Sequence, residues 1–397
     1  MPALTRRQLL TVAAAAPFGA SAMRARARSA PAPRILVLVE LNGGNDGLNT
    51  VIPYADPAYA AARPTLSVAR EKVLQLDQRL GLHPALKPLM AVWQAKELGI
   101  ALGVGYQRPN RSHFRSIEIW NSASAAEDVL RDGWLHRVLT ETGADRASPP
   151  LFPAPAFAAQ GIVLGGPAGP LAGSALAPVV MRDPRQLGQA ARLLDGNAAP
   201  TGNPALAHIL ATRARMHDAA LDIARRLHDA PPLTAPFPKS ALGRQFQLAA
   251  GLIGAGVPAS FFKLQHSGYD THARQAPRHA ALLGELAAAL VAFRAAMIEA
   301  GAWERVLVMT YAEFGRRVAE NASGGSDHGT AAPHFLLGGR LKGGLFGEQP
   351  PLDDLDGGDL RPRLDFRRLY AAVAEGWLGL PAAPDSLGRH APLPLFG

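Results

Sequence analysis

The sequence predicts an α/β protein with a mostly parallel central sheet covered by helices on both faces. Continuous apolar runs suit strands that are buried on both sides, and helix-like segments separate these runs. Alternation of strand and helix is typical of parallel sheets with crossover helices. Apolar residues make up 48% of the 397 residues, which is enough to bury a large core.

Five apolar runs are predicted as strands because they are short and bounded by glycine or polar residues. They cover residues 34–41, 98–106, 257–265, 305–311 and 333–337, and two short strands are expected near 161–164 and 179–181. Predicted helices cover residues 85–97, a segment that contains Ile117 and Trp120, and residues 203–229, 280–301 and 365–378. The Pro-, Ala- and Gly-rich segment 145–203 is otherwise expected to be irregular.

Residues 1–30 have the features of an export signal. The paired arginines Arg6 and Arg7 precede a short apolar run, and residues 20–22 are small enough for a cleavage site. We expect a twin-arginine signal peptide and short linker over 1–30, followed by one domain over 31–397. The partner would be the twin-arginine translocase, and the mature protein would be periplasmic or secreted. An ordinary basic N-terminus is the alternative.

Composition limits the possible partners and ligands. The formal charge is +9, but five arginines and no acid fall within residues 1–30, which leaves +4 for the rest of the chain. A charge this small gives no reason to expect a nucleic-acid partner. Later stretches do not reach about 18 uncharged apolar residues, so no transmembrane segment is expected in the mature chain. Cysteine is absent, so a metal would have to bind His, Asp, Glu or Asn.

Polar residues gather where the predicted strands end, and parallel sheets bind ligands at that edge. The side chains concerned are Asn42, Asn45, Asp46, Arg111, Ser112, His113, His266, Asp270, His272, His279, Glu313, Arg316, Arg317, Asp327 and His328. Carboxylates and imidazoles together suit a divalent metal. Taken singly, each pattern also fits a solvated turn, a helix cap or an exposed charged face.

Several motifs together resemble one known family. They are Leu-Asn-Gly-Gly-Asn-Asp-Gly-Leu-Asn-Thr at 41–50, Asn-Arg-Ser-His-Phe-Arg-Ser at 110–116, Tyr-Asp-Thr-His at 269–272, Glu-Phe-Gly-Arg-Arg at 313–317 and Ser-Asp-His-Gly-Thr-Ala at 326–331. With the paired arginines, this set resembles the domain-of-unknown-function family 1501. The fold of that family is similar to the alkaline phosphatase and sulfatase superfamily.

The resemblance implies roles for individual residues. Ser112 matches the nucleophile at a helix N-terminus, and Arg111 and Arg316 would pair with the non-bridging oxygens of a phosphoryl or sulfuryl group. The implied metal ligands are Asp46, Asp270, His272, Glu313, Asp327 and His328, with His279 in reserve. The metal would be divalent: Zn, Ca, Mg or Mn. The superfamily has Asp-His where this chain has Glu313-Phe314, so one imidazole is lost there.

The sequence therefore favours an exported, metal-dependent hydrolase of phosphate or sulfate esters. The alternative is a non-catalytic exported binding or scaffold protein, with a cell-envelope ligand and a degenerate metal site. A serine hydrolase of the nucleophile-elbow type is disfavoured because Gly-x-Ser-x-Gly is absent. Residues 42–47 do not fit the Gly-x-Gly-x-x-Gly nucleotide motif, and residues 354–359 lack the full calcium-loop pattern.

Overall fold

A sheet of nine strands runs through the described part of the protein. The computed structural model describes residues 33–143, 161–173, 178–181, 201–381, 385–388 and 390–397, so the predicted signal segment 1–30 lies outside it. In spatial order the strands are β11 (Gly344–Phe346), β5 (Leu98–Gly105), β10 (Ala332–Gly338), β9 (Val306–Tyr311), β1 (Ile35–Asn42), β8 (Phe261–Ser267), β6 (Gly161–Val163) and β7 (Val179–Val180). The ninth strand, β14 (Leu364–Asp365), pairs with β5.

Strand β10 runs against its neighbours. β1 is parallel to both β8 and β9, whereas β10 is antiparallel to both β5 and β9. Every other pair among the described strands of this sheet is parallel, which confirms the predicted sheet type. Because β10 is reversed, its first residue, Ala332, lies at the edge where β1, β5, β8 and β9 end.

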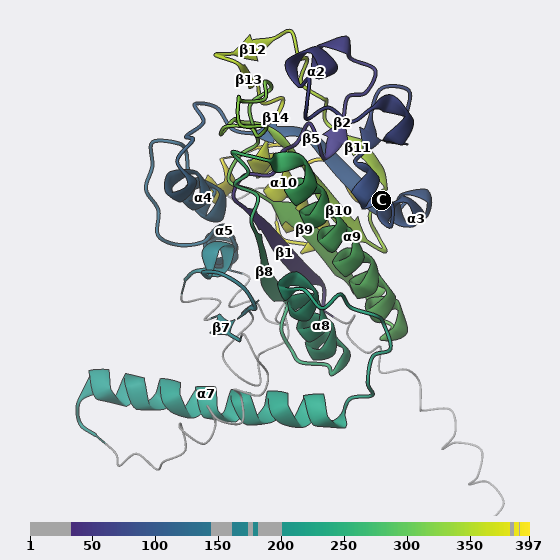
Figure 1. Cartoon of the computed structure of the whole chain (residues 1–397). Helices are drawn as coiled ribbons and strands as arrows, with labels where there is room; N and C mark the ends of the chain where they lie inside the picture. The colour runs from purple at the N-terminus through teal and green to yellow at the C-terminus, as the bar shows by residue number, and fades with distance from the viewer. Residues whose placement is uncertain (1–32, 144–160, 174–177, 182–200, 382–384, 389) are drawn as a thin grey trace, which may run out of the picture. The chain divides into compact units, whose positions relative to one another are not determined.

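Helices cover both faces of the sheet, as predicted (Figure 1). Successive side chains of β1 point to opposite faces. Val37 and Val39 pack in the layer that contains α3 (Leu89–Gln94), α8 (Ala241–Gly254) and α9 (Gln275–Glu299). Leu36 and Leu38 pack in the layer that contains α4 (His113–Ser122), α5 (Trp134–Glu141) and α10 (Phe366–Ala372).

Shorter elements complete the described fold. The remaining helices are α2 (Pro57–Ala62), α7 (Pro204–Asp229), the π-helical turn Val373–Trp377 and the 3-10 turns Arg70–Lys72, Pro84–Leu86, Gly169–Leu171, Trp303–Arg305 and Asp385–Leu387. β2 (Val51–Ile52), β3 (Leu74–Gln75) and β4 (Gly81–Leu82) form a small sheet, and β12 (Leu355–Asp356) and β13 (Asp359–Leu360) form a hairpin.

Helix α9 combines great length with an apolar composition. Among the described residues it is the one helix long and apolar enough to cross a membrane by those two measures alone. Half of its apolar window is buried, and Leu286, Leu290 and Phe293 belong to the core beside the sheet. The core helix of an α/β domain has these same features.

The predicted elements are present, with some differences at their ends. Asn203 and Asp365, the first residues of two predicted helices, instead cap α7 and α10 through their side-chain oxygens. The predicted helix over 85–97 is interrupted at Pro88, which begins the shorter α3. Helix α9 starts five residues earlier than predicted, and α5 and α8 were not predicted.

A buried ion pair joins the loop after β1 to the C-terminal end of α2. Arg63 Nη1 lies 2.6 Å from Asp46 Oδ2, and both side chains are fully buried. Arg63 also donates to the backbone carbonyls of Val318 and Arg317. Burial works against the charge of Asp46, but Arg63, together with His279 and the Asn49 amide, outweighs this effect and lowers the pKa of Asp46.

We predict that Arg63→Met lowers the free energy of unfolding by about 3–5 kcal/mol, because Asp46 would remain buried without its partner. Urea unfolding at pH 7 measures this loss. Arg361→Met is the matched control, since Arg361 pairs with Asp354 on the surface at 3.0 Å and should change stability by less than about 1 kcal/mol.

The difference in the free energy of unfolding between wild type and Arg63→Met should become smaller at acidic pH. In the wild type the pKa of Asp46 is lowered below 3.8, so its stabilising contribution is present at neutral pH and is lost as the pH falls through the folded-state pKa. In the variant an unpaired buried carboxyl gains stability by binding a proton. A gap that stays constant from pH 7 to pH 3 would contradict this account.

Candidate metal centre

Loops from distant parts of the chain meet at the carboxyl edge of the sheet. The loop after β5 leads into α4 at His113, and the loop after β8 contains Asp270 and His272. The loop between β9 and β10 begins beside Glu313 and contains His328. Both ends of this last loop lie at the same edge because β10 is antiparallel to β9.

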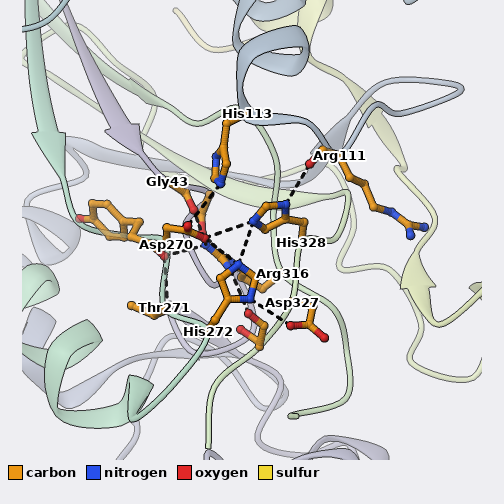
Figure 2. Close-up of polar contacts among 12 residues, drawn as sticks. Gly43, Arg111, His113, Asp270, Thr271, His272, Arg316, Asp327 and His328 are labelled. Atoms are coloured by element: carbon orange, nitrogen blue, oxygen red, sulfur yellow. Dashed lines mark hydrogen bonds and ion pairs between the residues drawn. The ribbon is translucent and has the colours of Figure 1, made fainter. Parts of the chain in front are cut away.

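Four side chains from these loops form one group, which we call the His–Asp cluster: His113, Asp270, His272 and His328 (Figure 2). His272 Nε2 lies 3.0 Å from Asp270 Oδ1 and 3.0 Å from His328 Nε2. His328 Nε2 lies 3.2 Å from Asp270 Oδ1, and His113 Nε2 lies 3.5 Å from Asp270 Oδ2. Each imidazole thus turns its Nε2 toward the same carboxylate.

The Nδ1 atom of each cluster histidine is held by an oxygen acceptor. His113 Nδ1 is 2.8 Å from Glu313 Oε1, and His272 Nδ1 is 3.0 Å from Asp327 Oδ1. His328 Nδ1 is 2.9 Å from the carbonyl oxygen of Arg111. Carboxylates and carbonyls accept hydrogen bonds, so each Nδ1 can donate a proton to its acceptor, and a neutral ring in that tautomer has its lone pair on Nε2.

This arrangement fits a cation among the Nε2 atoms. The Nε2 atoms of His272 and His328 lie 3.0 Å apart. His113 Nε2 is buried and has no hydrogen-bond partner among the described residues. Two nitrogen ligands of one tetrahedral zinc ion are about 3.3 Å apart. Metal-binding histidines are commonly oriented by an acceptor on the other ring nitrogen, as all three are here.

The strongest candidate ligands are His113, Asp270 and His328, whose ligand atoms all lie within 4.8 Å of one another. Within the described residues, this is the group of three or more histidines and carboxylates that meets this spacing. His272 adds a third imidazole at 3.0 Å from Asp270. The structure therefore brings together three of the predicted ligands, Asp270, His272 and His328, and adds His113.

Arg316 fixes the position of the Asp270 carboxylate from the protein interior. Its Nη2 donates to Asp270 Oδ1 at 2.7 Å, and its side chain is fully buried. Desolvation opposes the charge of Asp270, but the hydrogen bond and charge of Arg316, with His328 and His272, together outweigh it and lower the pKa of Asp270 to about 2. The carboxylate is therefore ionised and ready to bind a cation at neutral pH.

Glu313 and Phe314 fix the position of His113. Glu313 is fully buried, and its Oε1 accepts hydrogen bonds from His113 and from the Gly43 amide at 2.9 Å. The hydrogen bond to Glu313 raises the pKa of His113. The Phe314 ring lies 4.9 Å from the His113 ring and 4.6 Å from the His328 ring, measured between centroids. Phe314 supplies no imidazole at this position, and His113 contributes one from the start of α4.

Three of the predicted metal ligands do not point into the cluster. Glu313 and Asp327 instead hold Nδ1 of His113 and His272. Asp46 is paired with Arg63 and accepts a hydrogen bond from Gln275. The reserve residue His279 bonds to Asn45 Oδ1 at 2.9 Å, and burial lowers the pKa of His279 to about 4. Asp46 and His279 thus belong to a buried network beside the cluster.

The predicted catalytic residues occupy different environments. Ser112 is exposed at the N-cap of α4, and its hydroxyl caps no amide among the described residues of that helix. Arg111 directs its side chain away from the cluster (Figure 2) and contacts Asp359. Arg316 directs its donors to Asp270 and to the carbonyls of surrounding loops, so it supports the site from the interior rather than facing a ligand.

Sequence reasoning noted His113 among the polar residues at the edge but gave it no role as a ligand. The neighbouring Ser112 matches the nucleophile position of the superfamily, so the functional role was predicted for Ser112. The available signal was the start of an apolar-periodic helix directly after a predicted strand. It places both residues near the edge but does not indicate which of them points inward.

Comparisons with known proteins give a family and distant structural likenesses. The family described as "Protein of unknown function (DUF1501)" matches residues 189–363, which confirms the family predicted from the motifs. No curated protein sequence matches the chain. The structure of Ps i-CgsB in complex with k-i-k-neocarrahexaose is 11% identical, with 91% of this chain and 75% of that chain covered and a TM-score of 0.40. The lipoteichoic acid synthase LtaP from Listeria monocytogenes is 10% identical, with 80% and 67% covered and a TM-score of 0.31.

We predict that Glu313→Gln weakens binding of a divalent metal by about 10- to 100-fold, because the amide no longer fixes the protonated Nδ1 of His113 as a carboxylate does. Isothermal titration of the metal-free protein with zinc measures the change. His390→Ala is the control, since His390 lies near Asp365 and outside the cluster. Equal zinc affinity in wild type and Glu313→Gln would contradict the assigned role of Glu313.

Proposed function

We propose that this chain, a member of the DUF1501 family, is an exported metal-dependent hydrolase of phosphate or sulfate esters. The observation that supports the proposal is the convergence of three oriented imidazole Nε2 atoms on the ionised carboxylate of Asp270. This nitrogen-rich donor set favours zinc over calcium, magnesium and manganese, which suit oxygen ligands. A bound divalent cation would act as a Lewis acid on an oxygen of the ester and would lower the pKa of a nearby hydroxyl.

Ser112 is the proposed nucleophile. It lies between Arg111, whose carbonyl oxygen contacts His328, and His113, whose ring is part of the cluster. The N-terminus of α4 favours an anionic group because of its partial positive charge. The Ser112 oxygen would form a bond to phosphorus or sulfur while the ester oxygen leaves as an alcohol. Water would then release phosphate or sulfate and restore the hydroxyl.

The remaining residues position these groups. His113 and His328 are held by Glu313 and by the Arg111 carbonyl, so their rings cannot rotate without losing a hydrogen bond. Asp327 holds His272 in the same way and itself accepts a hydrogen bond from Asn321 at 3.1 Å. Because these side chains are already oriented, little free energy is needed to order them when an ion or a transition state binds.

A non-catalytic binding protein is the second candidate. The ion pairs made by Arg111 and Arg316 favour it. Arg316 is buried against Asp270, and Arg111 pairs with Asp359, so both predicted anion-binding residues are engaged. Asp46 is likewise neutralised by Arg63. On this alternative the cluster would bind one metal ion that organises a surface for a cell-envelope ligand. Metal binding without ester turnover would support it.

We predict that the zinc-loaded protein hydrolyses 4-nitrophenyl phosphate or 4-nitrophenyl sulfate, and that Ser112→Ala lowers kcat by about 100-fold or more because the nucleophile is lost. Release of 4-nitrophenol measures the rate. Ser323→Ala, at an exposed serine outside the cluster, should keep the wild-type rate. Turnover that persists in Ser112→Ala would exclude Ser112 as the nucleophile, and no turnover with either ester would favour the binding protein.

Export is proposed on the sequence alone. We predict that replacing Arg6 and Arg7 by lysine retains the full-length chain in the cytoplasm, because the paired arginines are the feature that the twin-arginine route would recognise. Cell fractionation and immunoblotting of both forms in a bacterial host measure the distribution. Equal amounts of both forms in the periplasm would contradict the twin-arginine route.

A further inference from the structure

The β12–β13 hairpin carries a buried carboxylate that two arginines share. Asp359 is fully buried. Its Oδ2 contacts Arg111 Nη2, and its Oδ1 lies 3.5 Å from Arg317 Nε. Both arginines belong to the loops that hold the His–Asp cluster, since the carbonyl of Arg111 contacts His328 and Arg317 follows Arg316. Asp359 therefore connects the hairpin to the margin of the proposed active site.

The pairing of Asp359 is incomplete. Beyond these two ion-pair contacts, neither carboxylate oxygen has a hydrogen-bond partner among the described residues. Burial raises the pKa of Asp359, although Arg111 and Arg317 both oppose this shift. A buried carboxylate that relies on ion pairs alone, with its other lone pairs unsatisfied, recovers only part of the free energy lost on leaving water. Asp359 is thus a weakly stabilised occupant of its site.

The two arginines, in contrast, are accessible to a ligand. The side chains of Arg111 and Arg317 are 46% and 36% exposed, whereas that of Asp359 is 1% exposed. A guanidinium group presents a planar set of donors that matches carboxylate, sulfate and phosphate. An incoming anion could therefore pair with Arg111 and Arg317 from the solvent side and take the place of Asp359.

We propose that Arg111 and Arg317 form an anion-binding site beside the His–Asp cluster, and that Asp359 occupies this site until an anionic group of the substrate displaces it. The inference rests on the proposed function and extends it to the substrate class. The substrate is an ester that carries a second anionic group, a carboxylate, sulfate or phosphate, next to the one that is cleaved.

The hairpin is built in a way that permits this exchange. β12 and β13 pair through only two residue pairs, Leu355 with Leu360 and Asp356 with Asp359. The turn between them uses Gly357 and Gly358, at φ of +57° and +89°. A short hairpin with few paired residues opens locally at a lower free energy than the core. Once it opens, the Asp359 carboxylate becomes hydrated while the anion occupies the arginines.

Titration with sodium sulfate tests the proposal without using turnover. We expect Asp359→Asn to bind sulfate about tenfold more tightly than wild type. This factor corresponds to a wild-type protein in which Asp359 occupies the site about nine-tenths of the time, so that only about a tenth of the molecules can bind sulfate. Asp356→Asn, on the same hairpin, should bind like wild type. Adding Arg111→Gln to Asp359→Asn should abolish the gain. The titrations are run by calorimetry on EDTA-treated and on zinc-loaded full-length protein. Sulfate that binds at the metal is then identified because this binding is absent from the EDTA-treated protein.

Equal or weaker sulfate binding by Asp359→Asn would overturn the proposal, because Asp359 would then serve only to anchor the hairpin. Should that variant fail to fold, hydrogen exchange on the wild type decides the question. Amides of residues 355–360 should exchange faster at saturating sulfate, and unchanged exchange would overturn the proposal. A lack of ester turnover would count against the proposed function but would leave the sulfate result in EDTA-treated protein standing.

Discussion

The arrangement of this site depends on one buried guanidinium group, that of Arg316. It donates to the carbonyls of Gly43 and Gly44 after β1, to Tyr269 and Asp270 after β8, and to Ser326 before β10. Three loops that are far apart in sequence are thereby fixed to a single side chain, which also neutralises Asp270. Removing a buried charge that satisfies so many acceptors would leave several of them unpaired, so the loops and the cluster are stable only together.

Around that centre, hydrogen bonds from the surrounding loops decide what each histidine can do. Glu313, Asp327 and the Arg111 carbonyl each accept a hydrogen bond from Nδ1 of one ring, which turns the three Nε2 atoms toward the same place. Phe314 packs against two of these rings and prevents them from turning away. Besides Glu313 and Asp327, Asp46 is the remaining carboxylate of this edge that was predicted as a ligand, and Arg63 neutralises it in the interior. The edge therefore offers one compact site for a cation.

The parts of the fold and site that depend on composition and local pattern could be predicted from the sequence. Apolar runs locate the strands, and the loops after them supply Asp270, His272 and His328. The direction of β10 could not be read, because an apolar run does not reveal whether its neighbours are parallel or antiparallel. Two ion pairs could not be predicted either, because they depend on tertiary packing that a local motif does not determine. They join Asp46 to Arg63, 17 residues away, and Arg111 to Asp359. The choice between Ser112 and His113 depends on the helix rotation at the N-terminus of α4, which the sequence leaves open.

The most direct test of the account is a crystal structure of the zinc-soaked full-length protein with diffraction recorded above and below the zinc absorption edge. The account predicts an anomalous peak bounded by Asp270 and by the Nε2 atoms of His113, His272 and His328, at distances of about 2.0–2.2 Å. A structure with full zinc saturation in solution but no peak among these four side chains would contradict it. Imidazoles that bind through Nδ1, with Glu313 and Asp327 released, would also contradict it.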